Sequence, residues 1–154
     1  ARDRVQEQQR EQEFEQRLQA ERRRLLELRA DELRIEQTVR HIQERILTLK
    51  CPRCEAAFFD FDGCFALTCA RCRCGFCAYC LHDCGNDAHR HVANCPHNIA
   101  PGRDLYGNPA LFERAQRERR QRMVREYLAT LDGPIRQRVV AACAQDFADH
   151  GIQG

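Results

Sequence analysis

Cysteines are concentrated in one short stretch of this chain. Residues 51–80 hold eight of its eleven cysteines, and these include three regularly placed CxxC pairs. A CxxC pair suits zinc because its short turn lets two thiolates reach one ion at about 2.3 Å. One pair is weak evidence, but three pairs followed by His89, His91 and Cys95 are typical of two tetrahedral zinc sites. We therefore predict Zn²⁺ as the cofactor, with two ions per chain, rather than a disulfide framework.

The segment that carries these cysteines, residues 51–97, is too short to fold on hydrophobic burial alone. Fewer than about fifty residues rarely enclose a sufficient core, whereas structural zinc contributes about 10–16 kcal/mol to small finger peptides. The metal would therefore supply the missing folding free energy. Thiolate ligands also indicate a reducing compartment, so we expect a cytoplasmic protein, with a nuclear or cytoskeletal assembly as the alternative.

The charge of the chain gives no general case for nucleic-acid binding. The formal net charge is +2; seven bound thiolates would remove seven charges and two Zn²⁺ ions would add four, which leaves −1. Residues 114–125 form a basic run, but glutamates are interspersed and aromatic residues for base stacking are largely absent. We expect this run to be a solvated helix face. The sequence also has no transmembrane run, so we expect partners that are proteins rather than nucleic acids or membranes.

Residues 1–50 predict one long helix. They contain no Gly or Pro and consist mainly of Arg, Glu, Gln and Leu, which favour helices. Nine of the twelve heptad a and d positions are apolar: Phe14, Leu18, Leu25, Leu28, Ile35, Val39, Ile42, Ile46 and Leu49. This pattern indicates a coiled coil, with a solvated single helix held by charge pairs as the alternative. Another copy, a different protein or the C-terminal helices would cover the apolar seam.

The expected fold class is mainly α with a small irregular zinc-stabilised module. A coiled-coil helix over 1–50 leads into a two-zinc finger with short β-hairpins over 51–97. Residues 98–108 carry two Gly and a Pro and are interpreted as a linker, and residues 109–154 are interpreted as a helical hairpin. Within the finger, aromatic alternation around an Asp-Gly turn signal predicts a β-hairpin over Phe59–Phe65.

The zinc segment resembles a known family. The residues that carry the resemblance are Cys51-Pro52-x-Cys54, Gly63-Cys64, Leu67-x-Cys69, Cys72 and Phe76-Cys77-x-x-Cys80. This pattern is similar to the in-between-RING and catalytic RING2-type fingers of RING-between-RING ubiquitin ligases. The resemblance covers about 45 residues and implies two zinc ions bound one after the other along the chain.

The resemblance also implies how the ligands divide. The first ion would take Cys51, Cys54, Cys69 and Cys72, and the second would take Cys77, Cys80, His91 and Cys95. The spacing of the pairs supports the same division. Three alternates stay open, because Cys74 could replace Cys72, and either Cys84 or His89 could replace His91 or Cys95.

Cys64 is the candidate catalytic residue, because the cysteine at its position in the family's catalytic finger accepts ubiquitin as a thioester. Its spacing leaves it outside both metal sites, as a nucleophile requires. Family members often carry a general-base histidine two residues later, where this chain has Ala66. A histidine from elsewhere in the fold, such as His82 or His89, would have to replace it. Without such a base we expect Cys64 to be an inert small hydrophobe.

Two functions from different classes follow. The leading hypothesis is a non-enzymatic zinc-binding interaction module, carried on a coiled coil into a larger assembly. The alternative is a fragment of a RING-between-RING-type ubiquitin ligase, with Cys64 as the ubiquitin-accepting nucleophile and ubiquitin or an E2 conjugating enzyme as partner. Because the chain begins at Ala1 and its only methionine is Met123, we also expect it to be a piece of a longer polypeptide.

Overall fold

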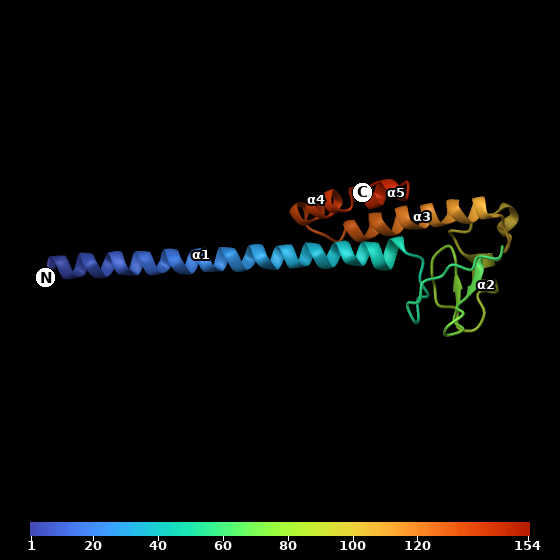
Figure 1. The fold of residues 1–154 in the computed structure, drawn as a ribbon, viewed down its shortest axis with the longest axis horizontal. Helices are drawn as coiled ribbons and strands as arrows, with labels where there is room; N and C mark the ends of the chain where they lie inside the picture. Colours follow the sequence, from blue (N-terminus) through green and yellow to red (C-terminus); the bar gives the residue numbers. More distant parts are fainter. The chain divides into compact units, whose positions relative to one another are not determined.

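The computed structural model describes all residues, 1–154, and its architecture is mainly helical (Figure 1). The chain forms two compact units, Ala1–Thr38 and Val39–Gly154. In chain order the elements are α1 (Arg2–His41), the π-helical turn η1 (Ile42–Leu47), β1 (Ala66–Thr68), β2 (Gly75–Cys77), α2 (His89–Asn94), the 3₁₀ turn η2 (Pro101–Arg103), α3 (Pro109–Leu128), α4 (Gly133–Ala142) and α5 (Ala144–Asp149). None of the helices is both long and apolar enough to span a membrane.

The long helical run expected at the N-terminus is present. It continues as α1 to His41 and ends in the π-helical turn η1, where Thr48 Oγ1 donates to the carbonyl of Gln43 over 2.9 Å. The apolar side chains of η1 are covered within their own unit, since Ile42 and Ile46 are buried and η1 packs against α3. For these last heptad positions the partner is therefore α3. Pairing of the preceding heptads with a second helix stays a prediction.

Arginines of α3 bond the carbonyls that η1 leaves free. The last turn of any helix lacks intrahelical partners for its C=O groups. Arg119 Nη1 donates to the carbonyl of Ile46 over 3.0 Å, and Arg120 Nε donates to that of Leu47 over 2.8 Å. Arg119 is fully buried, so the expectation of a solvated basic face is wrong for this residue. The spacing of the basic run could not reveal which of its arginines meets a buried helix end.

The finger is built around a two-stranded antiparallel sheet that pairs Leu67 of β1 with Phe76 of β2. The β-hairpin predicted over Phe59–Phe65 is wrong, because the strands lie at 66–68 and 75–77 instead. Phe58 and Phe61, which precede the strands, contribute through side-chain packing and not through backbone hydrogen bonds of a strand pair. Phe58 meets Phe76 edge-on, with 5.7 Å between ring centroids, and Phe61 stacks on a ring of α3. Aromatic packing against the sheet thus replaces the expected strand pairing.

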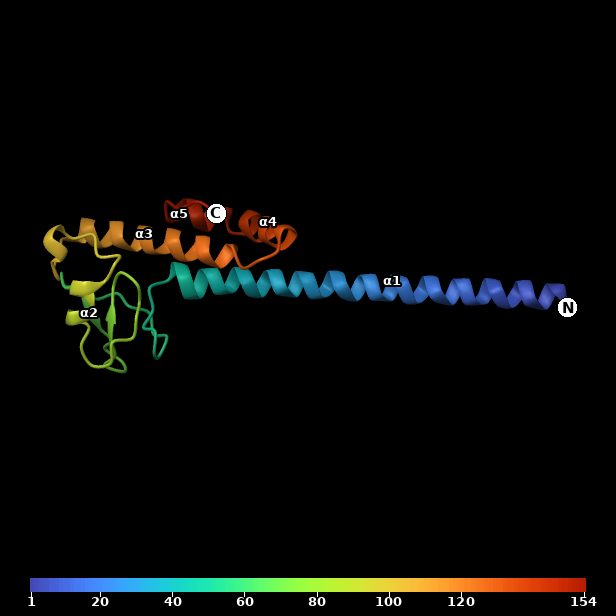
Figure 2. The same cartoon turned by 180° about the vertical axis from the view of Figure 1, so that it is seen from behind.

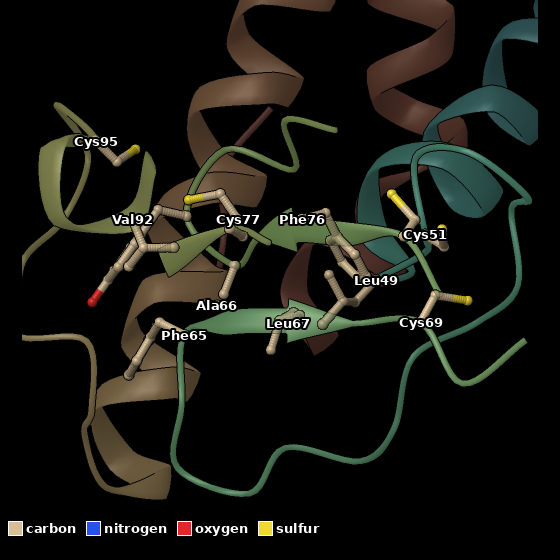
Figure 3. Packing of buried hydrophobic residues seen from close by; sticks show 14 of the residues in the cluster. Leu49, Cys51, Phe65, Ala66, Leu67, Cys69, Phe76, Cys77, Val92 and Cys95 are labelled. Carbon is tan, nitrogen blue, oxygen red and sulfur yellow. The ribbon is translucent and has the colours of Figure 1, made fainter. Parts of the chain in front are cut away.

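One hydrophobic cluster connects the sheet with the helices of its unit (Figure 3). Leu67 and Phe76 lie on the paired strands, while Leu49 and Val92 approach from either side. Phe65 stacks on Tyr79 with ring centroids 4.8 Å apart. The cluster is small and five of its fifteen buried residues are cysteines, which agrees with a fold that cannot rely on apolar burial alone.

Side-chain caps begin α3 and α4. Asn108 accepts a hydrogen bond from the backbone of Leu111 over 2.8 Å, and Asp132 accepts one from Ile135 over 3.0 Å. The second predicted helix is broken at Cys143, so that α4 and α5 replace one continuous helix. Figures 1 and 2 show α4 and α5 alongside α3.

Residues 98–108 pack on the finger. The backbone N–H of Phe65 donates to the carbonyl of Leu105 over 2.8 Å, and that of Gly107 donates to the carbonyl of Gly63 over 2.9 Å. A Cβ at Gly107 would come within 2.9 Å of the Phe65 ring, so this close approach requires glycine. The segment between finger and α3 therefore helps to hold the turn that carries Cys64.

Candidate functional site

The three CxxC turns share one backbone geometry. In each turn the residue four positions after the first cysteine donates its N–H to that cysteine's carbonyl, at 3.0 Å for Cys51, 2.9 Å for Cys69 and 2.8 Å for Cys77. The donating residues are Glu55, Arg73 and Leu81, and their φ angles are +65°, +66° and +60°. This left-handed conformation is unfavourable for residues with a Cβ. Its threefold recurrence indicates that the thiol positions, and not local propensity, determine these turns.

The first candidate centre brings together four sulfurs from two of these turns. The thiols of Cys51, Cys54, Cys69 and Cys72 all lie within 4.8 Å of one another. Sγ atoms are 3.6 Å apart for Cys51 and Cys72, and 3.6 Å apart for Cys54 and Cys69. Tetrahedral zinc with bonds of about 2.3 Å requires sulfurs about 3.8 Å apart. The four thiols therefore fit one tetrahedral Zn²⁺.

The second candidate centre combines the third turn with α2. The thiols of Cys77, Cys80 and Cys95 and one ring nitrogen of His91 all lie within 4.8 Å of one another. The Cys80 Sγ is 3.2 Å from His91 Nε2. α2 provides His91, and Cys95 follows directly at its C-cap. A Cys₃His set of this size fits a second tetrahedral ion.

Two thiols of these groups favour the anionic form that zinc binds. A hydrogen bond from the Cys77 thiol lowers the pKa of Cys80 to about 4, against an opposing effect of burial. For Cys69, burial acts in the opposite direction, but hydrogen bonds from the backbone of Cys72 and Arg71 lower the pKa to about 7. The hydrogen bond between Cys77 and Cys80 also raises the pKa of Cys77, so within that pair Cys80 is the thiol that loses its proton first and takes the form that ligates metal.

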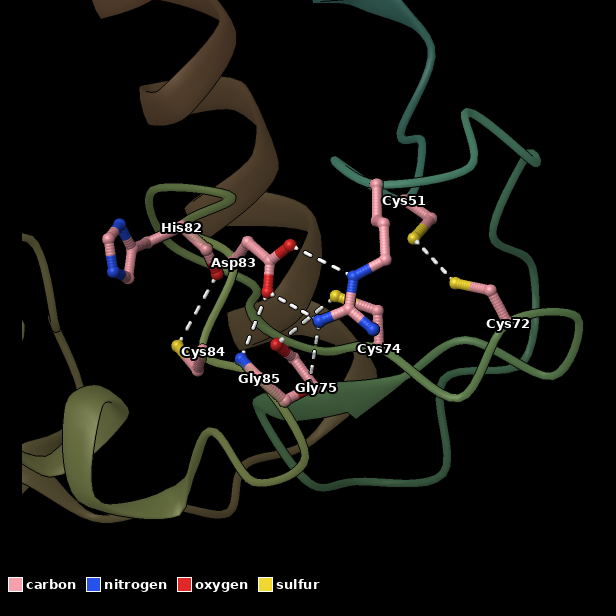
Figure 4. A network of polar contacts seen from close by, with 9 residues as sticks. Cys51, Cys72, Cys74, Gly75, His82, Asp83, Cys84 and Gly85 are labelled. Atoms are coloured by element: carbon pink, nitrogen blue, oxygen red, sulfur yellow. Dashed lines mark hydrogen bonds and ion pairs between the residues drawn. The ribbon is translucent and has the colours of Figure 1, made fainter.

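The three alternate ligands lie outside these two groups. Cys74 is buried and its Sγ donates to the carbonyl of Gly75 over 3.5 Å, and burial raises its pKa to about 12 (Figure 4). Cys84 gathers with His82 and His91 in a third group of possible ligand atoms. The rings of His82 and His91 are stacked, 4.7 Å between centroids and 16° between planes. Because lone pairs of stacked imidazoles lie in near-parallel planes, they do not converge on one ion.

His89, the remaining alternate, contacts Cys64 instead of a metal group. Its Nε2 lies 3.6 Å from the Cys64 Sγ, although 25 residues separate them. On its other side His89 Nδ1 contacts the carboxylate of Asp87, which also accepts the His89 backbone N–H over 3.0 Å. These hydrogen bonds, with the backbone N–H first, lower the pKa of Asp87. The result is a cysteine, histidine and carboxylate in series, the arrangement that activates thiol nucleophiles.

The turn before β1 presents Cys64 at the surface. Gly63 has φ +108°, and the next residue, Cys64, donates its N–H to Asp62 Oδ1 over 3.2 Å. Cys64 is half-buried and His89 is exposed, so a reactant can reach the thiol. Of the two histidines considered from sequence, His89 is the one that lies here. No local sequence pattern predicts the contact between Cys64 and His89, because the contact depends on the path of the loop over 83–88.

Comparison with known proteins found no matching family model and no matching solved structure. Two curated proteins are similar over 65 residues. These are Cullin-9 of Mus musculus at 34% identity and Cullin-9 of Homo sapiens at 32% identity. Each match covers 42% of this chain and 2% of the relative, so the chain spans a small fraction of the proteins that it matches. The chain is thus similar, at low identity, to a short segment of Cullin-9.

Proposed function

We propose that residues 51–97 form a two-zinc finger that serves as a protein-interaction module within a larger assembly. In this division residues 1–50 are the helical carrier, 98–108 connect the finger with α3, and 109–154 carry the helices α3, α4 and α5. The observation that supports the proposal is the presence of two separate groups, each with four ligand atoms. Similarity to a short segment of a much longer protein is consistent with a module of this kind.

The ligand sets favour a structural role for the metal. Each group offers four protein ligands, and a structural zinc uses four, whereas a catalytic zinc keeps one position open. Bound Zn²⁺ would supply the cross-links that the small core lacks. The chain's own residues then fix which surfaces a partner meets, among them Phe59, whose side chain is 85% exposed.

Metal analysis of the purified chain tests this role. We expect two zinc ions per chain, and we expect a chelator to unfold residues 51–97 while the helical circular dichroism of the N-terminal helix persists. Cys69→Ala should lose one ion. Cys143→Ala removes a buried thiol outside both groups and should keep both ions. Absence of bound metal, or an unchanged thermal melt after chelation, contradicts the proposal.

A second candidate function is thioester transfer of ubiquitin through Cys64. One observation favours it, the 3.6 Å contact between Cys64 Sγ and His89 Nε2, with Asp87 behind the imidazole. His89 would take the role of the base that the sequence lacks at position 66. In the step, the Cys64 thiol gives its proton to His89, and its sulfur attacks the carbonyl carbon of a ubiquitin thioester. The new C–S bond forms, the donor's C–S bond breaks, and the departing thiolate takes the proton from His89.

Two donors test this transfer. Ubiquitin charged on an E2 conjugating enzyme tests transfer together with donor recognition, and ubiquitin mercaptoethanesulfonate thioester tests the chemistry alone. A thiol-sensitive adduct on a non-reducing gel is expected for the intact chain and not for Cys64→Ala. His89→Ala should slow transfer by about 10²-fold or more, whereas His97→Ala should not. If neither donor gives an adduct, or if the adduct persists in Cys64→Ala, this candidate is wrong.

A further inference from the structure

An apolar face of α1 is exposed between residues 14 and 28. Phe14 is 59% exposed, Leu18 41%, Leu25 56% and Leu28 50%. These four residues occupy four of the five a and d positions between 14 and 28, so they lie along one side of the helix. An exposed apolar stripe of this kind on a helix is typical of a surface that binds another helix.

Charges within this stripe oppose self-pairing. Glu21 occupies the d position between Leu18 and Leu25. In a parallel pair of identical helices each d residue faces its own copy, so two Glu21 carboxylates would meet in the seam. In an antiparallel pair that sets Leu18 opposite Leu28, Glu21 would face Leu25 and lose water without gaining a cation. Both arrangements bury a carboxylate without compensation.

The flanks of the stripe oppose self-pairing as well. From residue 17 onward the g positions are Arg17 and Arg24 and the e positions are Arg22 and Arg29, whereas the e position beside Phe14 is Glu15. In a parallel pair, each g residue faces the e residue five positions further along the other helix. Two copies would therefore place Arg17 against Arg22, and Arg24 against Arg29. Like charges at these positions select against a partner of the same sequence.

We infer, building on the interaction role proposed above, that this face binds an acidic amphipathic helix of a different protein. Apolar residues at its own a and d positions would cover Phe14, Leu18, Leu25 and Leu28. Its e and g positions would carry Glu or Asp opposite the four arginines, and a Lys or Arg would lie opposite Glu21. Within the chain, Glu21 forms one solvent-exposed ion pair, in which its Oε1 lies 3.7 Å from Arg24 Nη2. Exposed pairs of this kind are weak, so a partner's charges readily replace it.

Two synthetic helices test the charge preference on the full, zinc-loaded chain. Both carry Leu at every a and d position except the one opposite Glu21, which is Lys. One has Glu at every e and g position, and the other has Lys there. By fluorescence anisotropy we expect the Glu helix to bind at least about tenfold more tightly than the Lys helix, with a preference that added salt reduces. Equal binding of the two helices, or no binding of the Glu helix, overturns the inference.

Two neighbouring leucines provide matched variants. Leu25→Asp should abolish binding of the Glu helix because it places a carboxylate in the seam. Leu26 is 68% exposed but occupies the b position off the seam, so Leu26→Asp should bind as the parent chain does. Circular dichroism checks that both variants keep their helix content. If Leu25→Asp binds as tightly as the parent, the apolar stripe is not the docking face.

Sedimentation of the full chain distinguishes a second copy from a foreign helix. We expect a monomer, because of the like charges described above. A dimer that Leu25→Asp dissociates would show that another copy covers the face, and would overturn the inference. Zinc content is measured on the same samples. A chain that binds the Glu helix but holds no zinc would refute the finger's proposed role and leave the docking face standing.

Discussion

The guanidinium of Arg53 donates two hydrogen bonds to the carboxylate of Asp83, over 3.1 Å from Nε and 2.9 Å from Nη2 (Figure 4). Arg53 lies inside the first CxxC turn, between Cys51 and Cys54, and Asp83 follows Cys80 of the second candidate centre. The hydrogen bonds from Arg53, with a further one from the Gly85 backbone, lower the pKa of the Asp83 carboxyl. One ion pair thus connects the two halves of the finger.

We predict that Arg53→Lys lowers the melting temperature of the finger slightly and leaves both zinc ions bound. Lysine cannot donate two parallel hydrogen bonds to one carboxylate, and the pair is too exposed to carry much of the stability. Differential scanning calorimetry with metal analysis measures both quantities. The reversed pair, Arg53→Asp with Asp83→Arg, should recover part of the loss. Loss of an ion in Arg53→Lys would show that the pair supports a metal site directly.

Substitution of Gly75 tests whether the close packing of the Asp87–Ala88 backbone against β2 stabilises the protein. A Cβ at Gly75 would lie 2.9 Å from the backbone nitrogen of Asp87 and 3.1 Å from that of Ala88. Backbone atoms cannot move aside as a flexible side chain does, so Gly75→Ala should destabilise the protein by about 1–3 kcal/mol. It should also slow any reaction of Cys64. Urea unfolding measures the first effect, with Gly133→Ala as the control, since a Cβ there meets nothing within 4 Å.

Asp87→Asn tests how the imidazole beside Cys64 is oriented. An amide does not hold the His89 ring with the strength of a carboxylate, so we expect transfer to Cys64 to slow roughly 10–100-fold. Single-turnover assays with the ubiquitin thioester measure the rate, and metal analysis should still find two ions per chain. A variant that transfers at the parent rate would show that Asp87 has no part in orienting His89.

How much of the molecule the sequence predicts depends on the range of each interaction. The long N-terminal helical run was predicted correctly, because helix formation there depends on neighbouring residues. The β-hairpin over Phe59–Phe65 was wrong, since packing of its aromatic rings against other elements overrides strand propensity. The contact between Cys64 and His89 spans 25 residues, and only the fold brings them together.

Burial of Arg119 is the clearest case that a local pattern cannot predict. Nothing distinguishes this residue within the basic run of α3, yet it is fully buried, and Nε donates to Gln116 Oε1 over 2.8 Å. Desolvation by burial lowers its pKa. Its position depends on the carbonyl of Ile46, 73 residues earlier in the chain.

We therefore predict unequal effects for two arginines of α3. Arg119→Ala should destabilise the protein by about 3–5 kcal/mol, because it leaves a cavity and removes the donor to the carbonyl of Ile46. Arg117 is exposed, so Arg117→Ala should change the free energy of unfolding by less than about 0.5 kcal/mol. Urea denaturation followed by circular dichroism compares the two. Equal stability of the variants would contradict a structural role for Arg119.

The left-handed residues of the three CxxC turns affect how the finger would lose a bound ion. Glu55, Arg73 and Leu81 each keep a conformation that costs about 1–2 kcal/mol for a residue with a side chain. When an ion departs, that energy is released as the turn relaxes, so ion loss and backbone opening reinforce each other. Metal loss and unfolding of the turns would therefore be cooperative. At low zinc concentration, folded metal-bound fingers and unfolded metal-free fingers would coexist, and partly unfolded forms would be rare.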